Sequence, residues 1–593
     1  MRQRIDNEST NDPLRLFLKW IVSFGEQVVG GMRPKLILLA LVSICLSWFA
    51  LPVTLSAQSS PDPRFGAVEA FRDPKAARDL NLGWERIIFY WAELQRNGPN
   101  DAWNVFQVED GWLNDAASNG RQVVGLIENT PAWATDGVSG SGVPRGLYLP
   151  IDDPNNLWAG FIRTLVKRYA GRVDHWIIWN EPDIEPPADG VQFDGSVADY
   201  YQLVKVASIV AKQENSHAVI HLAGLTFYHD VANNRPPYLQ RFLDEAKKDP
   251  TAAEHNDYFD VATTHIYFSS DSVYDITQFF ANTLRRNGLH QPIWINETNA
   301  APSDDPLNPW SKPLFVTSLE QQAAFVPQAF AIGLAAGAER LSIYKLMDFP
   351  AYPPGFPAFG LIRADNTHRP AYAALKVVTT YFRDTRQARL IRTGSMELVT
   401  LDRGSQSTRV AWARGPSTTT ISLPAFAPEA QLVALDGTTQ AITAVNGAYQ
   451  IMLPAATCND PSRICAIGGI PIILVENAPA KLNAGPINPD TATPRSTSTP
   501  TVKPPTATRP AATSTLRPSQ TPSPTQPAPS QPPATSIVIP TATSTIEPIS
   551  ASMPQLPPAA AGSSSLIGLI VLGLGIELVL VIIALRLGIP RRS

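Results

Sequence analysis

Two glutamates in this sequence each follow a short apolar run. Glu181 stands in the sequence Trp-Asn-Glu-Pro after residues 175–178, and Glu297 directly follows residues 292–296. The proline after Glu181 prevents further strand pairing, so its carboxyl group is left at the end of a strand. Two carboxyl groups from two strands can protonate a leaving oxygen and attack an anomeric carbon, which is the chemistry of glycosidic bond cleavage. These glutamates are therefore the first candidates for catalysis.

Eight apolar runs separated by amphipathic stretches form the framework that would position both glutamates. The stretches 158–169 and 198–212 have helical spacing. Continuous apolar strands that alternate with helices predict a parallel (β/α)₈ TIM barrel, an α/β fold, over residues 64–385. In such a barrel the C-terminal strand ends face the active site, and the two glutamates end the fourth and seventh strands. The predicted strands are residues 65–68, 86–90, 123–127, 176–179, 219–223, 261–265, 293–296 and 341–344.

A different pattern begins after the predicted barrel. Short alternating runs at residues 397–400, 409–412, 420–423 and 470–474 are separated by Gly, Asp and Pro. Alternation with a period of two and frequent turn residues predict antiparallel strands. We therefore expect a small antiparallel β-sandwich over residues 387–480 as an accessory domain.

The N-terminal region has the order of an export signal. Residues 1–57 begin with a polar, basic cytoplasmic stretch, continue with the apolar segment 36–53 and end in small residues. This order is typical of a cleaved signal peptide, and the apolar length also fits an uncleaved signal anchor. Both alternatives predict that the following domains are transported across a membrane.

The C-terminal region combines a biased tract with a second apolar segment. Pro, Ser and Thr make up 38 of the residues 491–550, too many for a packed core, which predicts a disordered stalk over residues 485–562. The apolar segment 566–585 is long enough to cross a bilayer, and the arginines in the tail 586–593 mark its cytoplasmic side. The sequence thus predicts a transmembrane helix, a cell-membrane location and an extracellular barrel.

Charge and cysteine content exclude several other classes of function. The formal net charge is −4, which argues against a nucleic-acid partner because nucleic acids require a basic face. Cys458 and Cys465 are separated by a turn-like stretch, and we expect them to form a local disulfide in an oxidising compartment. The sequence has no Cys/His cluster with zinc spacing, so we expect neither a metal nor a cofactor.

Motifs along the whole barrel resemble those of clan A glycoside hydrolases, which are retaining enzymes, and look closest to relatives of the family 39 β-xylosidases. The Asn-Glu-Pro motif and the seventh strand are fairly specific when they occur together. The resemblance implies a (β/α)₈ fold, a carbohydrate substrate and hydrolysis with retention. The matching segments are residues 82–86, 91–94, 130–134, 168–169, 179–182, 264–267, 292–297, 359–362 and 369–372.

The resemblance also implies roles for individual residues. Glu181 would be the acid/base and Glu297 the nucleophile of a double-displacement reaction, and Asn180 would hydrogen-bond the sugar 2-hydroxyl. Each of these residues stands at the end of a predicted strand. The two glutamates must have different pKa values, because one has to be protonated while the other is ionised.

Three further residues would support the nucleophile. Tyr267, at the end of the sixth strand, would hydrogen-bond Glu297 and keep it ionised, with His265 beside it. Arg86, on the second strand, would add positive charge near the nucleophile and lower its pKa.

For four residues the sequence leaves two interpretations open. Trp133 and Trp91 are candidate platforms for a sugar ring, and packing at the barrel rim explains them equally well. Lys345 and Asp348, which follow the eighth strand, are either substrate contacts or partners in ion pairs.

Two details qualify the site. Asn296 stands where the clan usually has Thr before the nucleophile, which is a small departure from the pattern. Glu85 and Glu128 also lie at predicted strands, but such glutamates usually form surface or rim ion pairs, so we exclude both from the catalytic set.

The sequence therefore favours a cell-surface retaining glycoside hydrolase that acts on β-linked oligo- or polysaccharides. The alternative is a catalytically inactive surface protein that binds carbohydrate or mediates adhesion with the same barrel. Both hypotheses explain the export signal and the stalk, but only the first requires two intact carboxyl groups. The sugar, the linkage, endo or exo cleavage, and hydrolysis or transglycosylation stay open.

Overall fold

The computed structural model describes the barrel and the β-rich region that follows it. The predicted signal or anchor (1–57), stalk (485–562), transmembrane helix (566–585) and tail (586–593) lie outside the described residues. No helix within the described part of the chain is long and apolar enough to cross a membrane. The described residues are 60–186, 190–310, 313, 315–350, 357–458 and 465–483.

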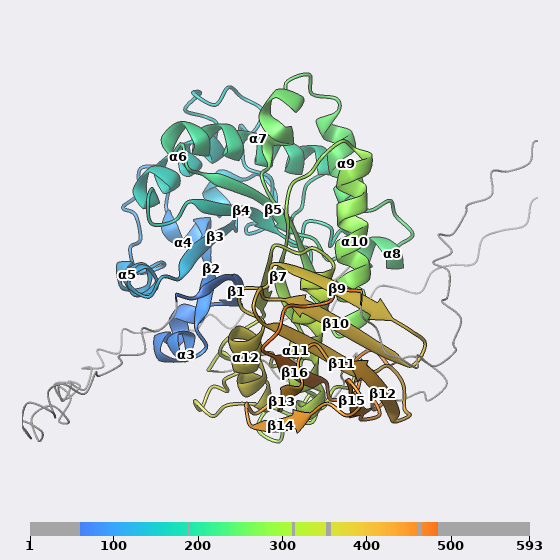
Figure 1. The fold of residues 1–593 in the computed structure, drawn as a ribbon. Helices are drawn as coiled ribbons and strands as arrows, with labels where there is room; N and C mark the ends of the chain where they lie inside the picture. Colours follow the sequence, from blue (N-terminus) through green and yellow to red (C-terminus); the bar gives the residue numbers. More distant parts are fainter. Residues whose placement is uncertain are drawn as a thin grey trace, which may run out of the picture. The chain divides into compact units, whose positions relative to one another are not determined.

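Eight parallel strands form a nearly closed barrel (Figure 1). They are hydrogen-bonded in the order β5-β4-β3-β2-β1-β8-β7-β6. The remaining seam, between β5 and β6, is bridged by two isolated pairs, His221 with Val261 and Leu225 with Thr264. All eight predicted strands are confirmed. They are β1 (Asp62–Val68), β2 (Leu82–Tyr90), β3 (Gln122–Glu128), β4 (His175–Asn180), β5 (Val219–Gly224), β6 (Ala262–Tyr267), β7 (Ile293–Asn299) and β8 (Arg340–Ile343).

Helices lie between the strands, as the alternating pattern predicts. Side chains cap several of them: Asn156 accepts from Ala159 N at α6, and reciprocal capping boxes begin α7 and α11. The predicted helices at 158–169 and 198–212 are confirmed as α6 and α7. The helices are α3 (Pro74–Asp79), α4 (Trp91–Leu94), α5 (Asp110–Ser118), α6 (Leu157–Tyr169), α7 (Val197–Glu214), α8 (Tyr228–Ala232), α9 (Tyr238–Ala246), α10 (Ser270–Arg286), α11 (Leu319–Ala335) and α12 (Pro370–Tyr381).

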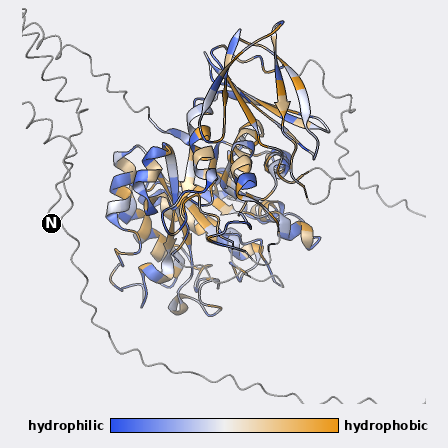
Figure 2. Cartoon of the chain, turned by 90° about the horizontal axis from the view of Figure 1, so that it is seen from below, coloured by the Kyte–Doolittle hydropathy of each residue, from blue (hydrophilic) through white to orange (hydrophobic). Residues whose placement is uncertain are grey.

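The barrel has two apolar layers, one inside the strands and one between strands and helices. Figure 2 shows orange, hydrophobic strands surrounded by helices that carry both blue and orange segments. Trp84, Val124, Leu126 and Trp294 belong to the inner cluster. Because side chains alternate along a strand, Arg86 faces the same interior as Trp84.

A register shift in β7 corrects one detail of the sequence prediction. Thr264 pairs with Ile295, but the next residue of β6, His265, pairs with Glu297. Asn296 is therefore the extra residue of a bulge, a feature that re-aims side chains next to active sites. The prediction that Glu297 ends the strand is wrong, because β7 continues to Asn299. Side-chain hydrogen bonds hold the last two residues of the strand in place. The Thr298 hydroxyl donates to a carbonyl of β6, and the Asn299 amide donates to a carbonyl of the segment after β8.

Antiparallel strands follow the barrel, as predicted. A six-stranded sheet has the order β14-β13-β16-β11-β10-β9, and β12 pairs with β15. One buried cluster joins both sheets, and Gln328 of α11 contacts the backbone of Gly468 and Gly469, so these sheets pack on the barrel. The strands are β9 (Gln387–Arg392), β10 (Met396–Asp402), β11 (Ser407–Ala413), β12 (Thr419–Pro424), β13 (Glu429–Val433), β14 (Thr439–Thr443), β15 (Ala448–Leu453) and β16 (Ile472–Glu476).

The predicted disulfide between Cys458 and Cys465 is confirmed, with a Cα–Cα distance of 5.2 Å. Cys465 N also donates to the Arg414 carbonyl at 2.9 Å, which ties this loop to the sheet. We predict that replacing both cysteines by serine lowers the free energy of unfolding by about 2–3 kcal/mol, because a short loop is no longer closed in the unfolded chain. Chemical denaturation of both proteins measures the difference. Equal free energies of unfolding for the wild type and the double variant would contradict this prediction. So would a reductant that destabilises the double variant as much as it destabilises the wild type.

Candidate active site

Glu181 lies immediately after β4, in a backbone conformation that few residues adopt. Trp179 has φ 75° and Glu181 has φ 41°, so both lie in the left-handed region that favours glycine. The Trp179 indole is anchored in the outer apolar layer, where its N–H donates to the Gln192 carbonyl at 2.8 Å. The turn leaves 18% of the Glu181 side chain exposed. Its carboxyl group is therefore accessible to a ligand.

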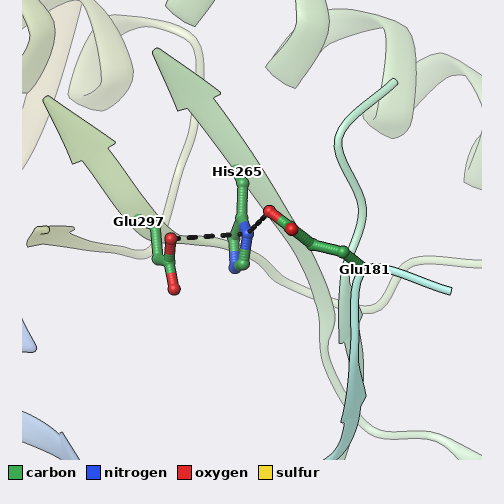
Figure 3. A group of neighbouring side chains, drawn as sticks. All are labelled: Glu181, His265 and Glu297. Atoms are coloured by element: carbon green, nitrogen blue, oxygen red, sulfur yellow. Dashed lines mark hydrogen bonds and ion pairs between the residues drawn. The ribbon is translucent and has the colours of Figure 1, made fainter. Parts of the chain in front are cut away.

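His265, on β6, stands between the two glutamates (Figure 3). Its Nδ1 lies 2.6 Å from Oε1 of Glu181 and 3.5 Å from Oε2 of Glu297. The imidazole is buried, and a Cβ on Gly224 would lie 2.0 Å from its Nε2. Gly224 of β5 thus leaves the space that the ring occupies. The structure thus brings together three of the predicted site residues, Glu181 after β4, His265 of β6 and Glu297 of β7.

Both oxygens of the Glu297 carboxyl group have a hydrogen-bond donor. Oε1 accepts from the Arg86 guanidinium, and Oε2 accepts from the Tyr267 hydroxyl. Burial acts to raise the pKa of Glu297, but Arg86, His265 and the Tyr267 hydrogen bond outweigh it, so the pKa lies below its ordinary value. Glu297 is therefore held as a carboxylate, the form that a nucleophile requires.

The charges around His265 favour its protonated form. Burial acts to lower the pKa of His265, but the neighbouring Glu297 and Glu181 raise it above its ordinary value, while Arg86 opposes them. The imidazole therefore keeps its proton to a higher pH than a free histidine does. Because Nδ1 lies 2.6 Å from Glu181, the proton on this nitrogen lies within a hydrogen bond of the Glu181 carboxyl group.

Two predicted residues keep polar atoms without a hydrogen-bond partner among the described residues. Arg86 has none at Nε and Nη1, and Asn180, the last residue of β4, has none at Oδ1. Buried polar groups are normally satisfied by protein or by bound molecules. A ligand rich in hydroxyl groups would supply partners to both side chains.

The structure separates the two tryptophans that the sequence treats alike. Trp91 is fully buried and packs in the outer layer, so it offers no face to a ligand. Trp133 lies in a short 3₁₀ helix (Ala132–Ala134) after β3 and is half-buried. Its indole N–H donates to the Gln95 carbonyl at 2.8 Å, and its ring meets Trp91 edge-on. A role for Trp133 in sugar stacking stays a prediction.

The ion-pair interpretation is confirmed for the two residues after β8. Lys345 Nζ lies 3.2 Å from Oε2 of Glu69, and Asp348 Oδ2 lies 2.6 Å from Arg369 Nη1. Burial lowers the pKa of Lys345 to about 8, while Glu69 opposes this shift. Both pairs fix the segment after β8.

The two glutamates that the sequence excludes differ from each other. Glu85 does form an ion pair, with Arg121 at 2.7 Å, although it is fully buried rather than at the surface. The side chain of Glu128, the last residue of β3, has no hydrogen bond or ion pair with any described residue, so the predicted ion pair is wrong. Burial raises the pKa of Glu128 to about 7, and the charges of Arg86 and Glu297 both act on it. The sequence did contain a signal for its position: Glu128 follows Val124 and Leu126 at a spacing of two, which places all three side chains on the same face of β3.

Asp183 is a second residue that sequence reasoning missed. Its carboxyl group is fully buried and accepts hydrogen bonds from Thr226 N and Oγ1, each at 2.8 Å, and from Phe227 N at 3.0 Å. It thus joins the segment after Glu181 to the segment after β5. Burial raises the pKa of Asp183 to about 7, and the nearby Glu181 adds to this shift.

The three central side chains also have the spacing of metal ligands. Ligand atoms of Glu181, His265 and Glu297 all lie within 4.8 Å of one another. A cation there would compete with the guanidinium of Arg86, which already contacts Glu297, and with the Tyr267 hydroxyl. Positive charge beside a carboxylate disfavours a second cation. The arrangement is therefore better suited to proton transfer and nucleophilic attack than to metal binding.

Comparison with known proteins relates the fold of this chain to solved structures of glycoside hydrolases. No family model matches the sequence, and no curated protein matches it. A family 39 glycoside hydrolase from the gut symbiont Bacteroides cellulosilyticus WH2 is similar, with 16% identity and a TM-score of 0.52 over 70% of this chain and 81% of that chain. The chain shares its (β/α)₈ barrel fold with this family 39 glycoside hydrolase. The fold that the sequence resemblance implies is thereby confirmed.

Two other solved structures are less similar. One is a monomeric β-xylosidase from Caulobacter crescentus CB15, with 14% identity and a TM-score of 0.47 over 70% of this chain and 95% of that chain. The other is the GH39 enzyme from Xanthomonas axonopodis pv. citri, with 12% identity and a TM-score of 0.45 over 70% of this chain and 93% of that chain.

The buried pair of Arg86 and Glu297 predicts a pH-dependent stability. Arg86→Met leaves a buried carboxylate without its guanidinium partner, so we expect a loss of about 3–5 kcal/mol in the free energy of unfolding near pH 7. In the wild type the lowered pKa of Glu297 keeps this contribution until pH falls below about 4.5. In the variant the guanidinium no longer opposes burial, so Glu297 takes up a proton at a higher pH and the cost of its buried charge is relieved. The difference in melting temperature between wild type and variant should therefore narrow between pH 7 and pH 4.

The matched control is Arg86→Met combined with Glu297→Gln, which removes the carboxylate as well. At neutral pH the melting temperature of this double variant should lie closer to that of the wild type than the melting temperature of Arg86→Met does. Because glutamine does not ionise, the melting temperature of the double variant should not depend on the protonation of residue 297. A difference for Arg86→Met that stays constant between pH 7 and pH 4 would show that the guanidinium stabilises the fold by packing alone.

Proposed function

We propose that this chain is a retaining glycoside hydrolase that cleaves β-linked O-glycosidic bonds in oligo- or polysaccharides. The observation that carries the proposal is the spacing of the two carboxyl groups, since oxygens of Glu181 and Glu297 lie within 4.8 Å of each other. Retaining enzymes hold their carboxyl groups about 5–5.5 Å apart, whereas inverting enzymes need about 6.5–9.5 Å to admit a water molecule. The spacing therefore favours double displacement.

In the first half of the reaction, a Glu297 oxygen attacks the anomeric carbon while the bond to the leaving oxygen breaks. Glu181 gives its proton to that oxygen, so the leaving group departs as a neutral alcohol. In the second half, Glu181 takes a proton from water, and the resulting hydroxide attacks the anomeric carbon. The bond to Glu297 then breaks, which restores the carboxylate and releases a sugar of the original anomeric configuration.

The residues that contact the two glutamates have different roles in the proposed reaction. Arg86 and Tyr267 keep Glu297 ionised before the attack. When the covalent bond forms, Glu297 loses its negative charge and these two contacts weaken. Nδ1 of His265 lies 2.6 Å from Oε1 of Glu181, so the imidazole stays hydrogen-bonded to this carboxyl group as Glu181 changes between acid and base. Asn180 would hydrogen-bond the 2-hydroxyl through its unpartnered amide. The family 39 glycoside hydrolase of similar fold supports the same class of reaction.

We predict different chemical rescue for the two catalytic glutamates. Glu297→Ala and Glu181→Ala should each lower kcat on 4-nitrophenyl β-glycosides by on the order of 10²–10⁴-fold or more. With added azide, Glu181→Ala should yield a β-glycosyl azide, because azide attacks the covalent intermediate. Glu297→Ala should yield an α-glycosyl azide, because azide replaces the nucleophile. Product NMR distinguishes the two anomers, and wild-type hydrolysis should release the β-anomer first.

Other outcomes of these measurements have clear meanings. Release of the α-anomer by the wild type would contradict the retaining mechanism. Absence of turnover on a broad glycoside panel, together with measurable glycan binding, would instead establish the alternative, a catalytically inactive carbohydrate-binding or adhesion protein. Products longer than the substrate would indicate transglycosylation by the same two residues.

We further propose that the enzyme is held at the cell membrane, with the barrel outside the cell. The support is the apolar segment 566–585, the arginines that follow it and the Pro/Ser/Thr-rich tract 485–562 before it. The full chain should sediment with membranes after alkaline extraction. A chain that ends at residue 484 should be released where the N-terminal segment 36–53 is cleaved, and should stay with the membrane where that segment is an uncleaved anchor. Recovery of the full chain in the supernatant would contradict the anchor.

A further inference from the structure

Strand register places the Glu128 carboxyl group inside the barrel mouth. Val124 and Leu126 of β3 belong to the apolar cluster that fills the barrel interior. Because side chains alternate along a strand, Glu128 faces the same interior, one layer above Leu126. It is the last residue of β3 and pairs in register with Tyr90, the last residue of β2. Glu128 thus lies at the level where the active site opens.

The electrostatic surroundings of Glu128 are those of the catalytic pair. Burial raises its pKa to about 7; Arg86 and His265 act to lower this value, and Glu297 and Glu181 act to raise it. The charges of all four site residues therefore reach this carboxyl group. Tyr90 completes the surroundings on the β2 side, and Glu128 in turn contributes to the raised pKa of its phenol.

Glu128 differs from the other carboxyl groups at this end of the barrel in having no partner. Glu181 is hydrogen-bonded to His265, and Glu297 contacts Arg86 and Tyr267. Glu69 and Asp348 form ion pairs with Lys345 and Arg369, respectively. Among the described residues, none donates a hydrogen bond to the half-buried Glu128. A carboxyl group removed from much of its water and given no partner is costly, unless a bound molecule satisfies it.

We propose that Glu128 is a substrate-binding residue of the same active site and accepts hydrogen bonds from hydroxyl groups of the sugar that Glu297 attacks. This inference rests on the proposed glycosidase function and adds a specificity to it. The carboxyl group has two oxygens, so it receives one or two hydroxyls of a neutral sugar. A sugar that carries its own carboxylate is disfavoured, because it would bring another negative charge toward Glu128 and Glu297.

The test combines a change in the enzyme with a change in the substrate. The probes are the best 4-nitrophenyl β-glycoside of the wild-type screen and its monodeoxy analogues. For the wild type, removal of the recognised hydroxyl should lower kcat/KM by on the order of 10–100-fold, the loss expected for a hydrogen bond to a charged group. For Glu128→Ala, the same deoxygenation should change kcat/KM by less than about threefold, because the partner is already absent.

Glu128→Gln tests the charge separately from the shape. It should retain part of the hydroxyl dependence and should reduce the discrimination between a 4-nitrophenyl β-glucuronide and the matching glucoside. The control is Glu339→Gln, an exposed glutamate that precedes β8 and therefore lies at the opposite end of the barrel. This control should behave as the wild type on every substrate.

The outcomes separate this inference from the proposed function. If the wild type is active and Glu128→Ala shows the same dependence on every hydroxyl as the wild type, Glu128 is not a substrate ligand although the chain is a glycosidase. If the wild type has no turnover, the proposed function fails by itself. Calorimetric titration of the whole panel of 4-nitrophenyl β-glycosides into wild type and Glu128→Ala then decides: weaker binding to the variant supports the role, and equal or absent binding overturns it.

Discussion

The buried contact between Arg86 and Glu297 is the interaction on which the rest of the site depends. Neither charge is stable alone inside the barrel, and each has only a few percent of its side chain exposed. Their pairing lets a carboxylate remain ionised where burial alone would protonate it. Once Glu297 is charged, it raises the pKa of His265, which in turn stands against Glu181. Glu181 and Glu297 are thus connected through one imidazole.

This linkage requires backbone features that hold the three side chains at hydrogen-bond distance. The bulge at Asn296 brings Glu297 level with His265, and without it the alternation of the strand would turn the carboxyl group away. Gly224 leaves room for the imidazole, and the left-handed turn through Trp179 and Glu181 aims the third group inward. Such local departures from regular geometry persist because the surrounding packed barrel over-determines them.

The sequence contained most of the fold but only part of the site. Continuous apolar strands report burial on both faces, so all eight strands and both catalytic candidates could be placed from the pattern. A bulge leaves no such pattern, because the extra residue, Asn296, is revealed only by the pairing of β7 with β6. Glu128 was excluded because most strand-end glutamates find an ion-pair partner, and partners from distant strands are not visible in sequence. The arrangement that distinguishes Glu85, paired with Arg121, from the unpaired Glu128 exists only in the folded chain.

In the proposed reaction, the charges of the site favour a positively charged transition state. Glu128, Glu181 and Glu297 face two cations, Arg86 and the protonated His265. Glycosidic cleavage develops positive charge on the anomeric carbon and ring oxygen, so each carboxylate that is ionised at that moment lowers the barrier. Arg86 limits this effect, because it must stabilise Glu297 before attack without cancelling the field around the sugar. A carboxyl group with a pKa near 7 is suited to this balance: it carries negative charge for part of the time and binds hydroxyls in either state.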